Sequence, residues 1–220
     1  MKEILALLDK ELKLEWRNKY AFNGMILYLV STVFISYLSF RIKSNTLTPP
    51  VWNTLFWIII LFTAINTIEK SFSKEGRNRQ GYYYSLASPE AVIFSKLIYN
   101  FLLMLLLTFL GFGIYSLFLE NPVQDIPLYL SSLLLGALGF AGVLTLVAGI
   151  ASKAENAGSL MALLSFPIII PMLLMLMRLS KNAMDGLAFS VSKDEIFTLL
   201  GLDIIVIALS YILFPYLWKS

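Results

Sequence analysis

The chain has 220 residues, of which 58% are hydrophobic, and a mean hydropathy of +0.77, which excludes an ordinary soluble domain. It contains neither cysteine nor histidine, so disulfides and thiol chemistry are excluded and the usual ligands of zinc and haem are missing. We therefore assign no catalytic residue, no metal and no cofactor to this chain. The net charge of +3 gives no support to a nucleic-acid partner, because membrane orientation explains most of the basic residues.

The first segment, KEILALLDKELKLEWR at residues 2–17, predicts an amphipathic helix, and residues 1–19 are assigned to it. Such a helix lies in the headgroup plane with its basic side toward anionic lipid, although an extension of the first span is the alternative. The first twenty residues lack a cleavage site of small residues after an apolar run, so no removable signal peptide is expected. The apolar arc of the helix comprises Ile4, Leu5, Leu8, Leu12 and Trp16, and the basic arc comprises Lys2, Lys10, Lys13 and Arg17.

Six further stretches approach the roughly 20 apolar residues that a helix needs to cross a bilayer. Lipid offers no partner to backbone amides and the alternating pattern of a membrane barrel is missing, so each stretch is expected to be a helix. The fold class is therefore an all-α polytopic membrane protein, organised as one transmembrane domain over residues 1–220. The expected spans are Tyr20–Phe40, Val51–Ile68, Leu97–Leu119, Leu128–Ala151, Leu160–Met177 and Ile196–Trp218.

The distribution of lysine and arginine predicts how these spans are oriented, because both residues resist translocation across the membrane. With a cytoplasmic amino terminus, twelve of the 17 basic residues lie on the inner side and five on the outer side. We therefore expect a multi-pass protein of a bacterial inner membrane with both termini in the cytoplasm.

The longest polar segment, residues 69–96, joins the second and third spans and lies on the cytoplasmic side in this orientation. Ser88 followed by Pro89 predicts the start of a helix with Ser88 as its N-cap. Upstream, three consecutive tyrosines stand beside basic residues, which favours a protein interface, with an interfacial tyrosine belt as the alternative. The residues assigned to this interface are Glu75, Gly76, Arg77, Arg79, Gly81, Tyr82, Tyr83 and Tyr84.

The fourth span and the outer loop at residues 179–195 carry predictions about packing and gating. Small residues at helical spacing in the fourth span predict close contact between helices. The outer loop has room for a small helix or a re-entrant excursion around Met184–Phe189 that shapes an outer gate, and a solvated connector is the alternative. The glycines of the fourth span are Gly136, Gly139, Gly142 and Gly149.

Pro167, Pro171 and Asp203 are the candidates for gating or translocation within the spans. The two prolines stand four residues apart and each removes a backbone hydrogen bond, so a bend is expected, whether structural or at a translocation site. Asp203 is the exceptional acid in spans that almost lack charge. It lies either about 10 Å inside the sixth span or at the outer headgroups, depending on where that helix begins.

No GxxxxGK[ST] motif is present, so any ATP that the system uses must bind to another protein. The overall layout resembles the ABC-2 export permeases, and two stretches resemble the CcmB haem-exporter permease family more closely. GYYYSLASPEAVIFSKLIYNFLL resembles that family's signature of a glycine, a Ser-Pro pair, a hydrophobic run and a lysine entering the third span. LLSFPIIIPMLLML resembles its leucine- and proline-rich fifth span.

The resemblance implies a permease subunit that acts in cytochrome c maturation. It implies a separate ABC ATPase subunit that docks on residues 69–96, further membrane subunits that handle haem, and haem as the transported or handled ligand. Six spans are half of the usual ABC set, which implies a homodimer or pairing with another membrane subunit. Two alternatives stay open at this point: a permease that exports lipid, polysaccharide or drug, and a membrane scaffold that transports nothing.

Overall fold

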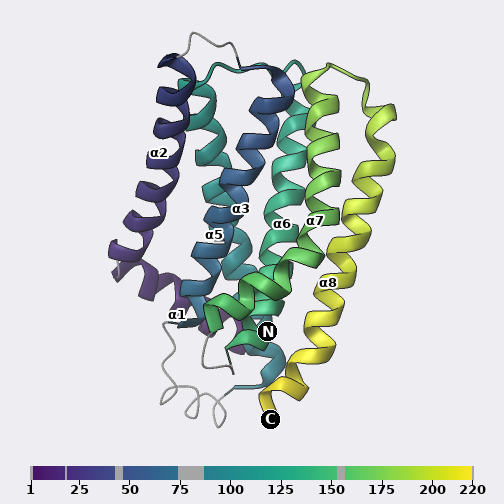
Figure 1. The fold of residues 1–220 in the computed structure, drawn as a ribbon. Helices are drawn as coiled ribbons and strands as arrows, with labels where there is room; N and C mark the ends of the chain where they lie inside the picture. The colour runs from purple at the N-terminus through teal and green to yellow at the C-terminus, as the bar shows by residue number, and fades with distance from the viewer. Residues whose placement is uncertain (1, 18, 43–46, 74–86, 153–156, 220) are drawn as a thin grey trace.

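The computed structural model describes residues 2–17, 19–42, 47–73, 87–152 and 157–219. In this part of the chain six helices are long and apolar enough to cross a membrane, and they lie side by side as a bundle (Figure 1). All six expected spans are confirmed, and with them the all-α polytopic fold. The helices are α1 (Lys2–Arg17), α2 (Lys19–Ile42), α3 (Pro49–Ser73), α5 (Pro89–Phe118), α6 (Ile126–Ala151), α7 (Ala157–Met184), the 3-10 helix η1 (Phe189–Ser192) and α8 (Lys193–Lys219).

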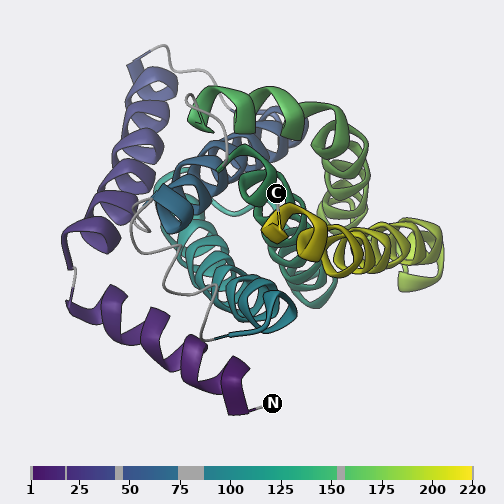
Figure 2. The ribbon, with the colours of Figure 1, turned by 90° about the horizontal axis from the view of Figure 1, so that it is seen from below.

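Helix α1 lies across one end of the bundle and is turned away from α2, so it does not extend the first span (Figures 1 and 2). The carboxyl ends of α3 and α8 and the amino end of α5 lie at the same end, which we call the α1 end; the opposite end is the far end. The predicted apolar arc of α1 is divided between two environments. Leu8 packs on the bundle, whereas Leu5 and Leu12 stay 60% and 47% exposed, available to lipid.

The polar segment between α3 and α5 is partly helical. Helix α3 continues to Ser73, and α5 begins at Pro89 with Ser88 as its N-cap, as the Ser-Pro pair predicts. The Ser88 hydroxyl accepts a hydrogen bond of 3.3 Å from the backbone N–H of Ala91, which satisfies one of the free amides of the first turn. The predicted interface residues, from Glu75 to Tyr84, lie outside the described residues.

Helix α6 occupies the centre of the bundle and packs against α3, α5, α7 and α8. Its glycines are the reason for this close approach, since a Cβ at Gly136 would stand 2.7 Å from the indole of Trp57. A Cβ at Gly142 would stand 3.4 Å from Val206 of α8. The packing role predicted for the small residues of this span is therefore what the structure has.

Helix α7 is continuous but bent. Its first half runs across the α1 end of the bundle and its second half runs along the bundle axis (Figure 1). Pro167 and Pro171 lie inside the helix, where each removes a backbone hydrogen bond, so they account for the predicted bend. After α7, Gly186 adopts a positive φ of 67°, and the small helix η1 follows at Phe189–Ser192, later in the chain than the Met184–Phe189 stretch where a small helix was expected.

The far end is closed by aromatic and polar contacts between α3, α5, α6 and α7. The Trp52 and Tyr115 ring centroids lie 4.6 Å apart, and the Tyr115 hydroxyl donates a 3.0 Å hydrogen bond to the carbonyl of Trp52. The Trp57 indole donates to the Ser180 hydroxyl at 2.8 Å, and that hydroxyl lies 2.8 Å from the Asn53 side-chain oxygen. This end is therefore cross-linked by contacts that span the sequence.

Candidate coupling site at the α1 end

Three acidic residues dock α1 on the first turns of α5. Glu3 accepts a hydrogen bond of 3.2 Å from the Ser88 hydroxyl, and Glu15 accepts one of 2.9 Å from the Tyr99 hydroxyl. Between them, Oε1 of Glu11 lies 3.6 Å from the amine of Lys96. The contacts advance in the same order along both helices, so the two segments are aligned in parallel where they meet.

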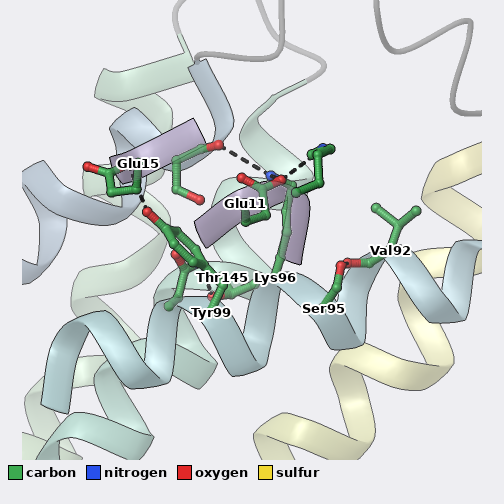
Figure 3. A network of polar contacts seen from close by, with 10 residues as sticks. Glu11, Glu15, Val92, Ser95, Lys96, Tyr99 and Thr145 are labelled. Carbon is green, nitrogen blue, oxygen red and sulfur yellow. Dashed lines mark hydrogen bonds and ion pairs between the residues drawn. The ribbon is translucent and has the colours of Figure 1, made fainter. Parts of the chain in front are cut away.

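Lys96 is the centre of this site (Figure 3). Its side chain is only 2% exposed, and its amine donates a 3.2 Å hydrogen bond to the carbonyl oxygen of Ser71, in the last turns of α3. Helix carbonyls in the last turn lack partners in their own helix, so this amine satisfies a group that would otherwise be buried unpaired. A single side chain of α5 thereby contacts both α3 and α1.

The polar contacts continue from α5 into the centre of the bundle. Asn100, which is fully buried, donates a 2.9 Å hydrogen bond to the Thr145 hydroxyl of α6. The side-chain oxygen of Asn100 and the hydroxyls of Thr67 and Ser71 have no hydrogen-bond partner among the described residues.

A further contact at the α1 end joins α3 to the first turn of α7. The Glu69 carboxylate lies so close to Gly158 that a Cβ there would collide with its Oε1. A carboxylate at this position interacts favourably with the amino-terminal end of a helix dipole. The carboxyl end of α3 therefore touches α5 through Lys96 and α7 through Glu69.

A second cluster surrounds Asp203 inside the bundle. Asp203 is 2% exposed and lies ten residues into α8, about 15 Å along the helix, so it belongs inside the span and not at the outer headgroups. A Cβ on Gly139 of α6 would stand 2.7 Å from its Oδ1 and would also collide with the sulfur of Met172. Met172 follows Pro171 directly, so the structure brings Asp203 and the bend of α7 together at Gly139.

The structure thus connects some of the predicted site residues and adds others. Pro167 and Pro171 form the bend of α7, Asp203 lies beside it, and the eight residues between Glu75 and Tyr84 lie outside the described part of the chain. The contacts of Glu11, Lys96 and Tyr99 were not predicted. Lys96 is the lysine of the quoted stretch that enters the third span. That position was the available signal for Lys96, but nothing in the sequence specified its partners.

A comparison with protein families identifies the family of this chain. The family model described as "CcmB protein" matches residues 2–216. The chain belongs to the CcmB family. As a CcmB protein it is the membrane permease component of a multi-subunit ABC system for haem export and cytochrome c biogenesis, a transporter subunit and not itself an enzyme. The family resemblance predicted from the sequence is confirmed. A comparison with curated protein sequences gives no match.

In this CcmB chain, the two stretches on which the resemblance rests form defined features of the fold. The Ser-Pro pair at Ser88 and Pro89 starts α5, and the lysine of the same stretch is the buried Lys96. The proline-rich stretch forms the bend of α7. Each stretch therefore marks a place where helices meet or change direction.

Proposed function

We propose that this CcmB chain couples ATP hydrolysis by a separate ABC ATPase to movement of its helix bundle, in the inner membrane and with both termini in the cytoplasm. The observation that carries the proposal is the meeting of α1, α3, α5 and α7 at the α1 end, where Lys96 and Glu69 join them. Most of the basic residues belong to the same side of the membrane in the predicted topology.

The ATPase contact in this proposal is the chain between α3 and α5, in particular Glu75, Gly76, Arg77, Arg79, Gly81 and Tyr82–Tyr84. Arginine and tyrosine are enriched in the buried parts of protein interfaces, where they supply area and hydrogen bonds at a modest entropic cost. A push on this segment reaches α3 and α5 directly, because it is continuous with both helices.

Replacing Arg77, Arg79 and Tyr82–Tyr84 together by alanine should abolish the stable association with the ATPase. Interface residues of these types contribute about 2 kcal/mol or more each when they are central to a contact. Their combined replacement should therefore remove most of the free energy of ATPase binding. The measurement is co-purification of the ATPase with the intact chain and with the variant from the same membranes.

The matched control is the double replacement Arg178→Ala and Lys181→Ala, which removes exposed basic residues from the far end. This control should bind the ATPase as the intact chain does. Undiminished ATPase binding by the loop variant would eliminate the coupling assignment, whatever the control does.

The partners in the membrane are, in this proposal, other haem-handling subunits or a second copy of the chain, since six spans are half of an ABC set. Haem is a substrate of the complex and not a resident cofactor of this chain. The absence of histidine and cysteine from the sequence supports ligation of haem by partner subunits.

The gating element of the proposal is the bend of α7 together with Asp203. A bent helix beside a buried acid can exchange between two packings, because Gly139 lets α6, α7 and α8 approach closely at that level. Neither carboxyl oxygen of Asp203 has a hydrogen-bond partner among the described residues. An acid that stabilises nothing in this state is a candidate for a role in another state.

Asp203→Ala should therefore stabilise the folded chain and impair export. Removing an unpaired buried carboxyl relieves a desolvation cost of about 1–3 kcal/mol, so the midpoint of thermal unfolding in detergent should rise. Haem delivery, measured as cytochrome c accumulation in cells that carry only the variant, should fall. A variant that is fully active would remove Asp203 from the gating element, and Thr198→Ala, at an exposed site on the same helix, controls for expression.

A further inference from the structure

Lys96 connects α1 to the two loop-bearing helices, α3 and α5. Helices α3 and α5 flank residues 74–86 in the chain, and the Lys96 amine holds the carbonyl of Ser71 on α3 while facing Glu11 on α1. Lys96 is among the largest fully buried side chains of the described chain. The three helices therefore share one buried cation.

Burial of this amine is not explained by stability alone. Replacing a buried ion pair by well-packed apolar groups is often neutral or stabilising, whereas removing one partner leaves a costly unpaired charge. A methionine or leucine could fill the same space between α3 and α5. What an apolar side chain cannot do is fix the direction and register of α1, because apolar contacts are not directional.

The other contacts of α1 set its register on α5. Glu3 bonds the N-cap residue Ser88 and Glu15 bonds Tyr99, one on each side of the Glu11 contact. Leu8 adds apolar packing against the cluster that contains Tyr99, Leu103 and Leu107. A helix held at three successive points cannot slide along its neighbour without breaking all three.

We propose that Lys96 is a positioning residue that joins the α3–α5 junction to α1, so that displacement of the loop-bearing helices moves α1 with them along the membrane surface. This inference rests on the proposed coupling function and adds its transmission route. The exposed Leu5 and Leu12 of α1 would carry that movement through the lipid headgroup layer.

Lys96→Met tests the route in the intact complex of the chain with the ABC ATPase that co-purifies with it, reconstituted in lipid nanodiscs. We expect the ATPase to bind within about twofold of its normal level while the change in turnover caused by the chain falls about fivefold or more, the lower end of coupling between sites. Lys96→Arg, which keeps the cation, should restore most of the response. Lys13→Met removes an exposed lysine that pairs with Asp9 within α1, and should behave as the intact chain.

A distance measurement separates transmission from simple stability. The chain has no cysteine, so nitroxide labels can be placed on Asp9→Cys in α1 and Asp185→Cys at the far end, both on exposed side chains. In the otherwise intact complex the distance between the labels should change when ATP is added. With Lys96→Met present the change should be clearly smaller, although the ATPase remains bound, because only the Glu3 and Glu15 contacts then hold α1 on α5.

The outcomes distinguish failure of the proposed coupling function from failure of the transmission route through Lys96. If the intact chain neither binds the ATPase nor alters its turnover, the proposed function fails and the transmission route fails with it. If the intact chain does both and Lys96→Met retains the full turnover response or the full distance change, the route alone is wrong. Should Lys96→Met not accumulate in membranes, Glu11→Leu decides, because it removes the acceptor on α1 and keeps the Lys96–Ser71 bond: retention of the full α1 movement in Glu11→Leu overturns the inference.

Discussion

Gly136→Leu is expected to destabilise the folded bundle by about 3 kcal/mol, the upper part of the range for overpacking a tight core. The cause is the indole of Trp57, from which even a Cβ at position 136 would stand 2.7 Å. Trp57 is fully buried, its nitrogen is bonded to Ser180 at 2.8 Å, and its ring packs against Phe140. The indole cannot move aside without losing these contacts. Unfolding of the purified chain by SDS titration, followed by tryptophan fluorescence, measures the change.

Gly113→Leu is the matched control for this prediction. Gly113 is an exposed helix-interior glycine of α5, and a Cβ placed on it would meet nothing within 4 Å. Leucine has the higher helix propensity, so the control should be as stable as the intact chain or slightly more so. Equal losses in the two variants would mean that α6 does not depend on close approach to α3, and the central place of α6 would need another explanation.

The parts of the fold that were predictable are those determined by local chemistry. Apolar length predicted all six spans because a bilayer accepts almost nothing else, and the N-cap at Ser88 was predictable because it depends on two adjacent residues. The bend of α7 likewise follows from two prolines within one helix. The glycines of α6 predicted that this helix packs closely, but they did not say that Trp57 and Met172 are its neighbours.

The parts that could not be predicted depend on how separate helices meet. The placement of Asp203 was open because it depended on whether the sixth span begins at Ile196 or nearer Leu202; α8 begins at Lys193, directly after η1. The contact between Glu11 and Lys96 depends on the docking direction of α1. A helical wheel assigns a residue to a face, but it contains no information about which neighbour that face meets.

These contacts divide the bundle into two ends of different character. The far end combines edge-packed aromatic rings with hydrogen bonds between distant helices, and the α1 end is held by charged contacts among α1, α3 and α5. In the proposed coupling mechanism, a displacement that starts at the α1 end requires a far end that keeps its packing. The far end is suited to hold.

Ser180→Ala should weaken the far end by about 1–3 kcal/mol. The Ser180 hydroxyl accepts from the Trp57 indole, and its single proton has the Asn53 side-chain oxygen at 2.8 Å and the Leu176 carbonyl at 2.6 Å as acceptors. Its removal leaves the buried indole N–H unpaired and removes one donor from this network. A buried group without its partner costs about 1–3 kcal/mol in water-soluble proteins, and single hydrogen bonds in membrane proteins average about 0.6 kcal/mol. The loss should appear as a lower midpoint in the same SDS titration.

Ser39→Ala controls for the loss of a hydroxyl, because Ser39 is exposed and bonds only the Ile35 carbonyl of its own helix at 2.9 Å among its described contacts. The control should change stability by less than about 0.5 kcal/mol, as surface substitutions do. Because the Ser180 network lies at the end opposite α1, Ser180→Ala should leave ATPase binding unchanged while it weakens the fold. A loss of ATPase binding without a loss of stability would show that the two ends are not separable, and the division between a holding end and a yielding end would be wrong.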